Sequence, residues 1–238
     1  MAGTTSTASQ SPGTVSEQVF SALRADILGG TLAPGDALAG ERPLAERLGC
    51  NRHAIREAVK RLQQAGLVEV AQGGATRVLD WRATGGLDLL TQLAGAGVDG
   101  TVDPQLGASV LPGVLEMRAC IGADVAGRCA ERAPDALLAE LPGLLDAVRD
   151  ARPEDLGARE DRYAELWARV VVGSDNLAYR LAFNSLVSGV NALGPVALSL
   201  LADELADDDG HRTLVDALLR RDAPAAELAA RALLTTVR

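Results

Sequence analysis

The feature that most constrains the fold is a pair of short helices predicted on either side of Gly49-Cys50. The sequence predicts one helix over residues 42–48 and a second over residues 51–65, with Asn51 as the N-cap of the second helix. The apolar face of the second helix consists of Ile55, Val59 and Leu62. Two helices joined by such a tight turn form a helix-turn-helix.

The segments on either side of this helix pair complete a small domain. Apolar residues recur at helical spacing from Val15 to Leu28, and Gly29-Gly30 ends that predicted helix. After the helix pair, residues 67–70 and 76–78 favour two short strands around a glycine-rich tip. Three helices followed by a β-hairpin wing predict an N-terminal winged helix.

The rest of the chain is predicted to be helical, so the protein is mainly α. From Trp81 onward, long runs of Ala, Leu and Val are interrupted by turn residues, and Pro112-Gly113 is expected to be one of these helix breaks. The most apolar segment, Val170–Leu201, is expected to supply the central helices of a C-terminal all-α bundle.

These patterns divide the chain into four parts. Residues 1–13 are rich in Ser, Thr and Gly and are predicted to be a disordered tail. Residues 14–79 form the predicted winged helix and residues 80–86 a linker. Residues 87–238 form the predicted all-α domain.

Charge is distributed unevenly between these parts. The formal net charge is −9, but residues 1–80 contain as many basic as acidic residues, so the later part carries the whole excess. Residues 42–61 contain six basic and two acidic residues. Such a local positive patch can bind phosphates, although a solvated helix face gives the same pattern.

Several classes of protein are excluded by what the sequence lacks. No apolar run approaches the roughly 20 residues of a membrane span, and there is no secretory signal, so a cytoplasmic location without membrane contact is expected. The three cysteines, Cys50, Cys120 and Cys129, form no CxxC pair. No GxSxG or Walker-type glycine motif is present, so the protein is not expected to be an enzyme.

Residues 15–78 closely resemble the winged-helix domain of the GntR superfamily of transcription regulators. A Leu-x-Pro-Gly turn carries this resemblance, together with short motifs in register: Glu41-Arg42, Leu44-Ala45, Leu48-Gly49, Arg56-Glu57 and Gly66-Leu67. It implies a transcription regulator that binds double-stranded DNA. The alternative is an interaction protein whose winged helix contacts another protein.

The DNA contacts are expected from the start of the second helix of the pair and from the wing. Arginine in the first turns of a recognition helix can bond a guanine edge. Arg42 stands where the relatives have a DNA-contacting arginine, and the wing tip is expected to approach the minor groove. The candidate DNA-binding residues are Arg42, Asn51, Arg52, His53, Arg56, Gln72 and Gly73.

The sequence VLDWRATGGLDLLTQLA is similar to the linker of the FadR branch, the fatty-acid-responsive regulators. This resemblance implies that residues 87–238 bind a small-molecule effector and form a homodimer on a palindromic operator. Many related effector domains hold a metal with Asp and His ligands, but Tyr163, Trp167 and Leu233 stand at three of those positions. Neither a metal nor another cofactor is therefore expected.

Apolar residues at the former metal positions favour an acyl chain, so the expected effector is long-chain acyl-CoA and the expected role is control of fatty-acid or other lipid metabolism. A small organic acid is the alternative effector. Arg118 is expected to bind an anionic head group, and His211 to hydrogen-bond near the Asp207–Asp209 turn. The candidate effector-binding residues are Arg118, Tyr163, Trp167, Asn176, Tyr179, Asn184 and His211.

Overall fold

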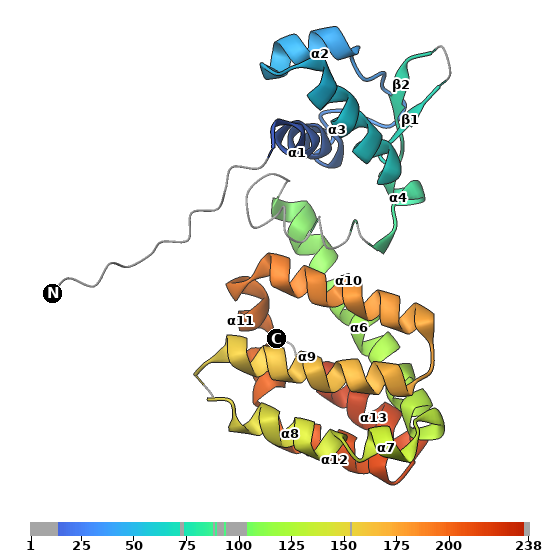
Figure 1. The fold of residues 1–238 in the computed structure, drawn as a ribbon, viewed down its shortest axis with the longest axis vertical. Helices are drawn as coiled ribbons and strands as arrows, with labels where there is room; N and C mark the ends of the chain where they lie inside the picture. The colour runs from blue at the N-terminus through green and yellow to red at the C-terminus, as the bar shows by residue number, and fades with distance from the viewer. Residues whose placement is uncertain are drawn as a thin grey trace, which may run out of the picture. The chain divides into compact units, whose positions relative to one another are not determined.

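The computed structural model describes residues 14–71, 74–87, 89, 93, 104–152 and 154–235. The chain divides into two compact units, Met1–Gly86 and Leu87–Arg238 (Figure 1). The predicted tail, residues 1–13, lies outside the described residues. Within the described part of the chain, no helix is long and apolar enough to cross a membrane.

The first unit is a winged helix, which confirms the sequence prediction. Its strands pair antiparallel, with Val68 opposite Val78 and Val70 opposite Thr76. Its main elements are α1 (Val15–Leu28), α2 (Glu41–Leu48), α3 (Arg52–Gln64), β1 (Val68–Val70) and β2 (Thr76–Val78).

Local sequence signals fix the turn between α2 and α3. Gly49 ends α2 with a φ of 62°, a left-handed conformation that glycine adopts without strain. The Oδ1 atom of Asn51 accepts a hydrogen bond from the Ala54 N–H at 2.8 Å and so caps α3. Because Ile55 and Leu62 are fully buried, the opposite face of α3 is left to solvent.

The predicted linker, residues 80–86, begins with a helical turn that the winged helix holds. This turn is α4 (Trp81–Thr84), which is capped by the side chain of Asp80. The Thr84 hydroxyl donates to the Gly66 carbonyl oxygen at 2.8 Å. The first part of the linker is therefore attached to the winged-helix unit.

The second unit is a helical bundle, as predicted. Its core is formed mainly by α6, α8, α9, α12 and α13 and includes Leu141, Leu166, Leu218 and Leu233. The helices are α6 (Pro104–Arg132), α7 (Asp135–Leu138), α8 (Leu141–Asp150), α9 (Leu156–Gly173), α10 (Leu177–Leu193), α11 (Pro195–Ala206), α12 (Asp208–Leu219) and α13 (Ala223–Leu234).

Two predictions for this unit are wrong in detail. Pro112 does not end a helix, because it lies inside α6, which continues to Arg132. The segment Val170–Leu201 is central only in part. Val171 of α9 is buried, whereas Leu177 and Leu181 of α10 are 72% and 59% exposed. Since other helices fill the core, α10 lies at the edge of the unit despite its apolar composition (Figure 1).

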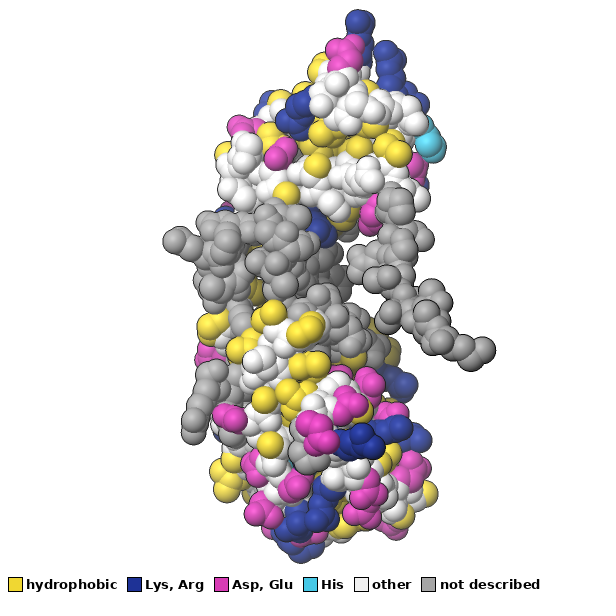
Figure 2. Space-filling model, turned by 90° about the vertical axis from the view of Figure 1, so that its left-hand side faces the viewer, with side chains coloured by type: hydrophobic (Ala, Val, Ile, Leu, Met, Phe, Trp, Pro, Cys, Tyr) yellow, Lys and Arg dark blue, Asp and Glu magenta, His cyan; other side chains and the backbone are white. Residues whose placement is uncertain are grey.

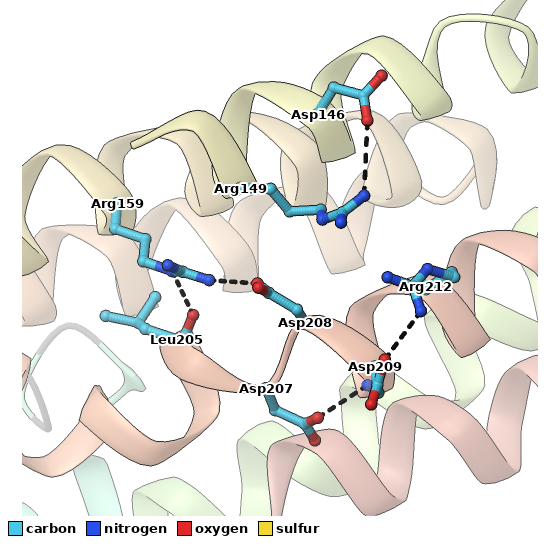
Figure 3. A network of polar contacts seen from close by, with 9 residues as sticks. Asp146, Arg149, Arg159, Leu205, Asp207, Asp208, Asp209 and Arg212 are labelled. Atoms are coloured by element: carbon cyan, nitrogen blue, oxygen red, sulfur yellow. Dashed lines mark hydrogen bonds and ion pairs between the residues drawn. The ribbon is translucent and has the colours of Figure 1, made fainter. Parts of the chain in front are cut away.

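A polar network joins α9 to the turn between α11 and α12 (Figure 3). Arg159 is buried, donates from Nε to the Leu205 carbonyl oxygen at 2.5 Å, and pairs with Asp208. Asp207 accepts a hydrogen bond from the Gly210 N–H at 2.8 Å and caps α12. These bonds satisfy a buried cation and fix the end of α11, where Glu204 precedes Leu205.

Candidate DNA-binding surface and effector cavity

The start of α3 presents the predicted DNA-binding side chains to solvent. Asn51, Arg52, His53 and Arg56 are all exposed, and so is Arg42 on α2. Lys and Arg side chains gather at the end of the winged-helix unit that lies at the top of Figure 2. An exposed N-terminal turn that carries arginine donors is the geometry that a recognition helix requires.

Ion pairs engage part of this basic surface. The Arg56 Nε atom lies 2.7 Å from Glu41 Oε1, and the Arg42 Nε atom lies 3.0 Å from Glu46 Oε1. The hydrogen bond from Arg56 lowers the pKa of Glu41. Arg52 forms no ion pair within the described residues. Arg52 is therefore the arginine on α3 that a base edge can engage without first displacing a carboxylate.

The wing tip lies outside the described residues. Gln72 and Gly73, the two residues expected to approach the minor groove, are not among the described residues. Their role in DNA binding stays a prediction.

A cavity of about 130 Å³ lies in the helical unit, among α6, α9, α10, α11 and α13. Most of its described lining is hydrophobic. The apolar side chains that enclose it include Leu115, Ile121, Val125, Phe183, Leu201 and Leu234. A partly open apolar space of this kind suits the hydrophobic part of a small ligand.

A buried ion pair occupies the polar side of this cavity. The Arg118 guanidinium binds both carboxylate oxygens of Glu204, at 2.6 and 2.5 Å, and the Glu204 side chain is fully buried. Burial alone lowers the pKa of Arg118, but the charge and hydrogen bonds of Glu204 outweigh it and raise that pKa above its ordinary value. The cation expected to bind an anionic head group thus already has a partner.

Two further polar side chains of the cavity have unused hydrogen-bonding capacity. Tyr163 and Trp167 line the cavity and are 3% and 6% exposed. Neither the Tyr163 hydroxyl nor the Trp167 Nε1 atom has a hydrogen-bond partner among the described residues. Burial and then the charge of Glu204 raise the pKa of Tyr163 well above its ordinary value, so the hydroxyl stays protonated near neutral pH.

His211 differs from its prediction. It is fully buried, its ring centroid lies 4.8 Å from that of Tyr163, and neither ring nitrogen has a partner among the described residues. The backbone N–H of His211 bonds the Asp207 carbonyl oxygen at 3.0 Å, but the ring forms no hydrogen bond to the Asp207–Asp209 turn among the described residues. Burial lowers the pKa of His211, which favours the neutral ring.

Of the three remaining candidate effector-binding residues, the structure places one at the cavity and two away from it. Tyr179 lines the cavity and donates its hydroxyl hydrogen to Asp124. Asn176 instead accepts a hydrogen bond from the Ala178 N–H, and Asn184 is exposed. Neither asparagine is among the residues that line the cavity, so their polar contacts with an effector at its mouth stay a prediction.

Sequence reasoning missed two acidic residues of the site. Glu204 pairs with Arg118, and Glu160, one helical turn before Tyr163, lines the cavity with an exposed fraction of only 9%. Burial raises the pKa of Glu160. The signal for Glu204 was weak, because it follows a second acid, the exposed Asp203, in the mostly apolar helix α11.

We expect the purified protein to contain no stoichiometric zinc, nickel or manganese. Within the described residues, no group of three or more His, Cys, Asp or Glu side chains lies close enough together to hold a metal ion, and a stable zinc site needs about four ligands. Elemental analysis and melting curves with and without a chelator test this expectation. One equivalent of bound metal would contradict it.

Models of two families match this chain. The model of the bacterial regulatory proteins of the gntR family covers residues 15–78, which include the winged helix, and the FCD domain model covers residues 113–236. The chain belongs to the GntR family. This GntR regulator is thus a DNA-binding transcriptional regulator with an FCD effector-binding domain.

Named relatives agree with this assignment. The transcriptional regulator Mce2R of Mycobacterium tuberculosis is 37% identical over 222 residues, which are 92% of this chain and 88% of the relative. The fatty acid metabolism regulator protein of Klebsiella pneumoniae is 31% identical over 157 residues, or 64% of this chain and 59% of the relative. These relatives are regulators rather than enzymes.

A solved structure shares the fold. The Listeria monocytogenes protein Lar, described as controlling expression of the agr system, matches with a TM-score of 0.56 and 15% sequence identity. The match covers 94% of this chain and 95% of that structure. At this identity the likeness concerns the fold alone.

Proposed function

We propose that an apolar effector binds the cavity of the FCD domain and weakens operator binding by the winged helix. The observation that carries this proposal is the cavity itself, which hydrophobic side chains enclose. A long-chain acyl-CoA is the effector that we favour, and genes of fatty-acid or other lipid metabolism are the targets. Support comes from the hydrophobic ring of Trp167 in the cavity wall and from relatives named as fatty acid metabolism regulators.

The size of the cavity adds a requirement to this proposal. A cavity of roughly 150 Å³ holds one benzene molecule, so about 130 Å³ accepts only a short part of a long acyl chain. The remainder extends through the open side of the cavity or displaces a wall that moves. The exposed residues Leu177 and Leu181 identify α10 as a weakly buried wall. Ligand entry and a shift of α10 are coupled in this mechanism.

We propose further that the regulator acts as a homodimer. Two recognition helices related by a two-fold axis read a palindromic operator when their spacing matches the half-sites. A ligand that repacks the FCD domain changes that spacing through the linker at residues 80–86. Because the effector and operator sites are then coupled, each ligand weakens binding of the other.

The alternative effector, a small organic acid, fits the cavity less well. Such a ligand needs an available cation, and Arg118 is bound on both carboxylate oxygens of Glu204. Other charged residues of the described lining are limited to the acid Glu160.

We expect palmitoyl-CoA and oleoyl-CoA to release the regulator from its operator. A tenfold loss of operator affinity requires about 1.4 kcal/mol of coupling between the two sites. The measurement is a mobility shift on the native operator, below the micelle concentration, with free CoA and a small dicarboxylate as controls. No response to either acyl-CoA would contradict the proposed effector, and release by the dicarboxylate would favour the organic acid.

A further inference from the structure

In the described lining of the cavity, the polar wall has hydrogen-bond donors without partners but no unpaired positive charge. The Tyr163 hydroxyl and the Trp167 indole N–H are buried, line the cavity and lack partners among the described residues. The charge of the cation Arg118 is paired with the Glu204 carboxylate through two hydrogen bonds. This combination discriminates between polar groups that carry a charge and those that do not.

We propose that the polar group of the ligand inside this cavity is an uncharged oxygen, the carbonyl of an ester or thioester or the oxygen of an alcohol, and that a carboxylate is excluded. The inference rests on the proposed function, since it concerns the same effector site. The ligand is then either a neutral, mainly apolar molecule or a larger molecule whose neutral end occupies the cavity.

Charge explains the exclusion. A carboxylate in the cavity lies near the acids Glu204 and Glu160, while the only cation in the described lining is already neutralised. Protonation of Glu160, which its burial favours, removes one repulsion but creates no positive charge. A buried anion without a counter-ion is strongly disfavoured relative to the same anion in water.

Hydrogen bonding explains the preference. A buried donor without an acceptor loses its hydrogen bond to water and gains nothing in return. An uncharged carbonyl or hydroxyl oxygen accepts hydrogen bonds from the Tyr163 hydroxyl or the Trp167 N–H, and an apolar body fills the space beside Phe183 and Leu201. One ligand then supplies both an acceptor for a buried donor and an apolar body for the hydrophobic wall.

A pair of isomers provides the test. Hexanoate and ethyl butanoate have the same carbon and oxygen atoms and suit a cavity of this size, but only hexanoate is charged at pH 7. We expect calorimetry on the full chain without DNA to show ethyl butanoate binding at least tenfold more tightly than hexanoate, with 1-hexanol also binding. Equal or tighter binding of hexanoate overturns the inference but leaves the effector cavity standing.

Variants of the cavity residues test whether they cause the preference for the ester over the carboxylate. Tyr163→Phe removes a hydroxyl that forms no hydrogen bond among the described residues, so we expect the fold to be retained. Ethyl butanoate should bind this variant roughly 2- to 10-fold more weakly, the range for one neutral hydrogen bond. Glu204→Gln frees the charge of Arg118 and should improve hexanoate binding, whereas the exposed change Glu131→Gln on α6 should not. Unchanged ester binding in Tyr163→Phe overturns the inference even where Glu204→Gln does not fold.

The outcomes separate this inference from the proposed function. Failure of all three small probes to bind at millimolar concentration overturns the cavity as the ligand site, and with it both proposals. Tight binding of ethyl butanoate together with an unaffected operator complex supports the inference and contradicts the proposed control of DNA binding.

Discussion

Replacing Glu204 with Ala is expected to lower the free energy of unfolding of the helical unit by about 3–5 kcal/mol, the cost of breaking a buried ion pair from one side. The variant leaves the Arg118 guanidinium buried beside the cavity without its two carboxylate bonds of 2.6 and 2.5 Å. Urea denaturation at pH 7 measures the effect. A Trp81→Phe background leaves Trp167 as the fluorophore, since the chain has two tryptophans.

Two comparisons show whether the unpaired charge is the cause. The double variant Arg118→Met/Glu204→Leu removes both charges and should be much more stable than Glu204→Ala, because buried pairs are often replaced by apolar residues without loss. Arg169→Ala breaks an ion pair with Glu140 on the surface and should cost less than about 1 kcal/mol. If Glu204→Ala lowers the free energy of unfolding by less than about 1 kcal/mol, the buried pair is not tightly coupled.

The winged helix was predictable because its determinants are local. The α2–α3 turn depends on Gly49 and Asn51, which lie two positions apart in the chain and act on the backbone within three or four residues. The apolar spacing that predicted the buried face of α3 is confirmed at Ile55 and Leu62, whereas Val59, the third predicted residue, is only partly buried. Such signals do not depend on how the rest of the molecule packs.

The effector cavity was only partly predictable because its determinants are distant in sequence. Arg118 and Glu204 are separated by 86 positions, so no local pattern reveals that they neutralise each other. The apolar helix α10 has the composition of a core helix but lies at the edge of the bundle, as the exposure of Leu177 shows. Hydrophobicity predicts that a face packs against something, but it does not identify the partner.

Arg52→Ala is expected to weaken operator binding roughly 5- to 150-fold, the range for loss of an arginine that reads a base edge. Arg52 is exposed at the first turn of α3 and forms no ion pair within the described residues, so its removal costs no packing or salt bridge there. Arg56→Ala should have a similar effect on the operator but also releases Glu41. Titration of labelled operator at a fixed salt concentration measures both variants.

The choice of control distinguishes a base contact from general electrostatics. Arg162→Ala removes one positive charge from the surface of α9, where Arg162 pairs with Glu165, and should leave operator affinity nearly unchanged. Binding to a non-specific duplex shows whether an arginine on α3 contacts a base or a phosphate. An arginine that reads a base contributes much more to operator binding than to binding of random sequence. An equal loss on both duplexes would make Arg52 a phosphate contact. Unchanged operator affinity in both arginine variants would show that α3 is not the recognition helix.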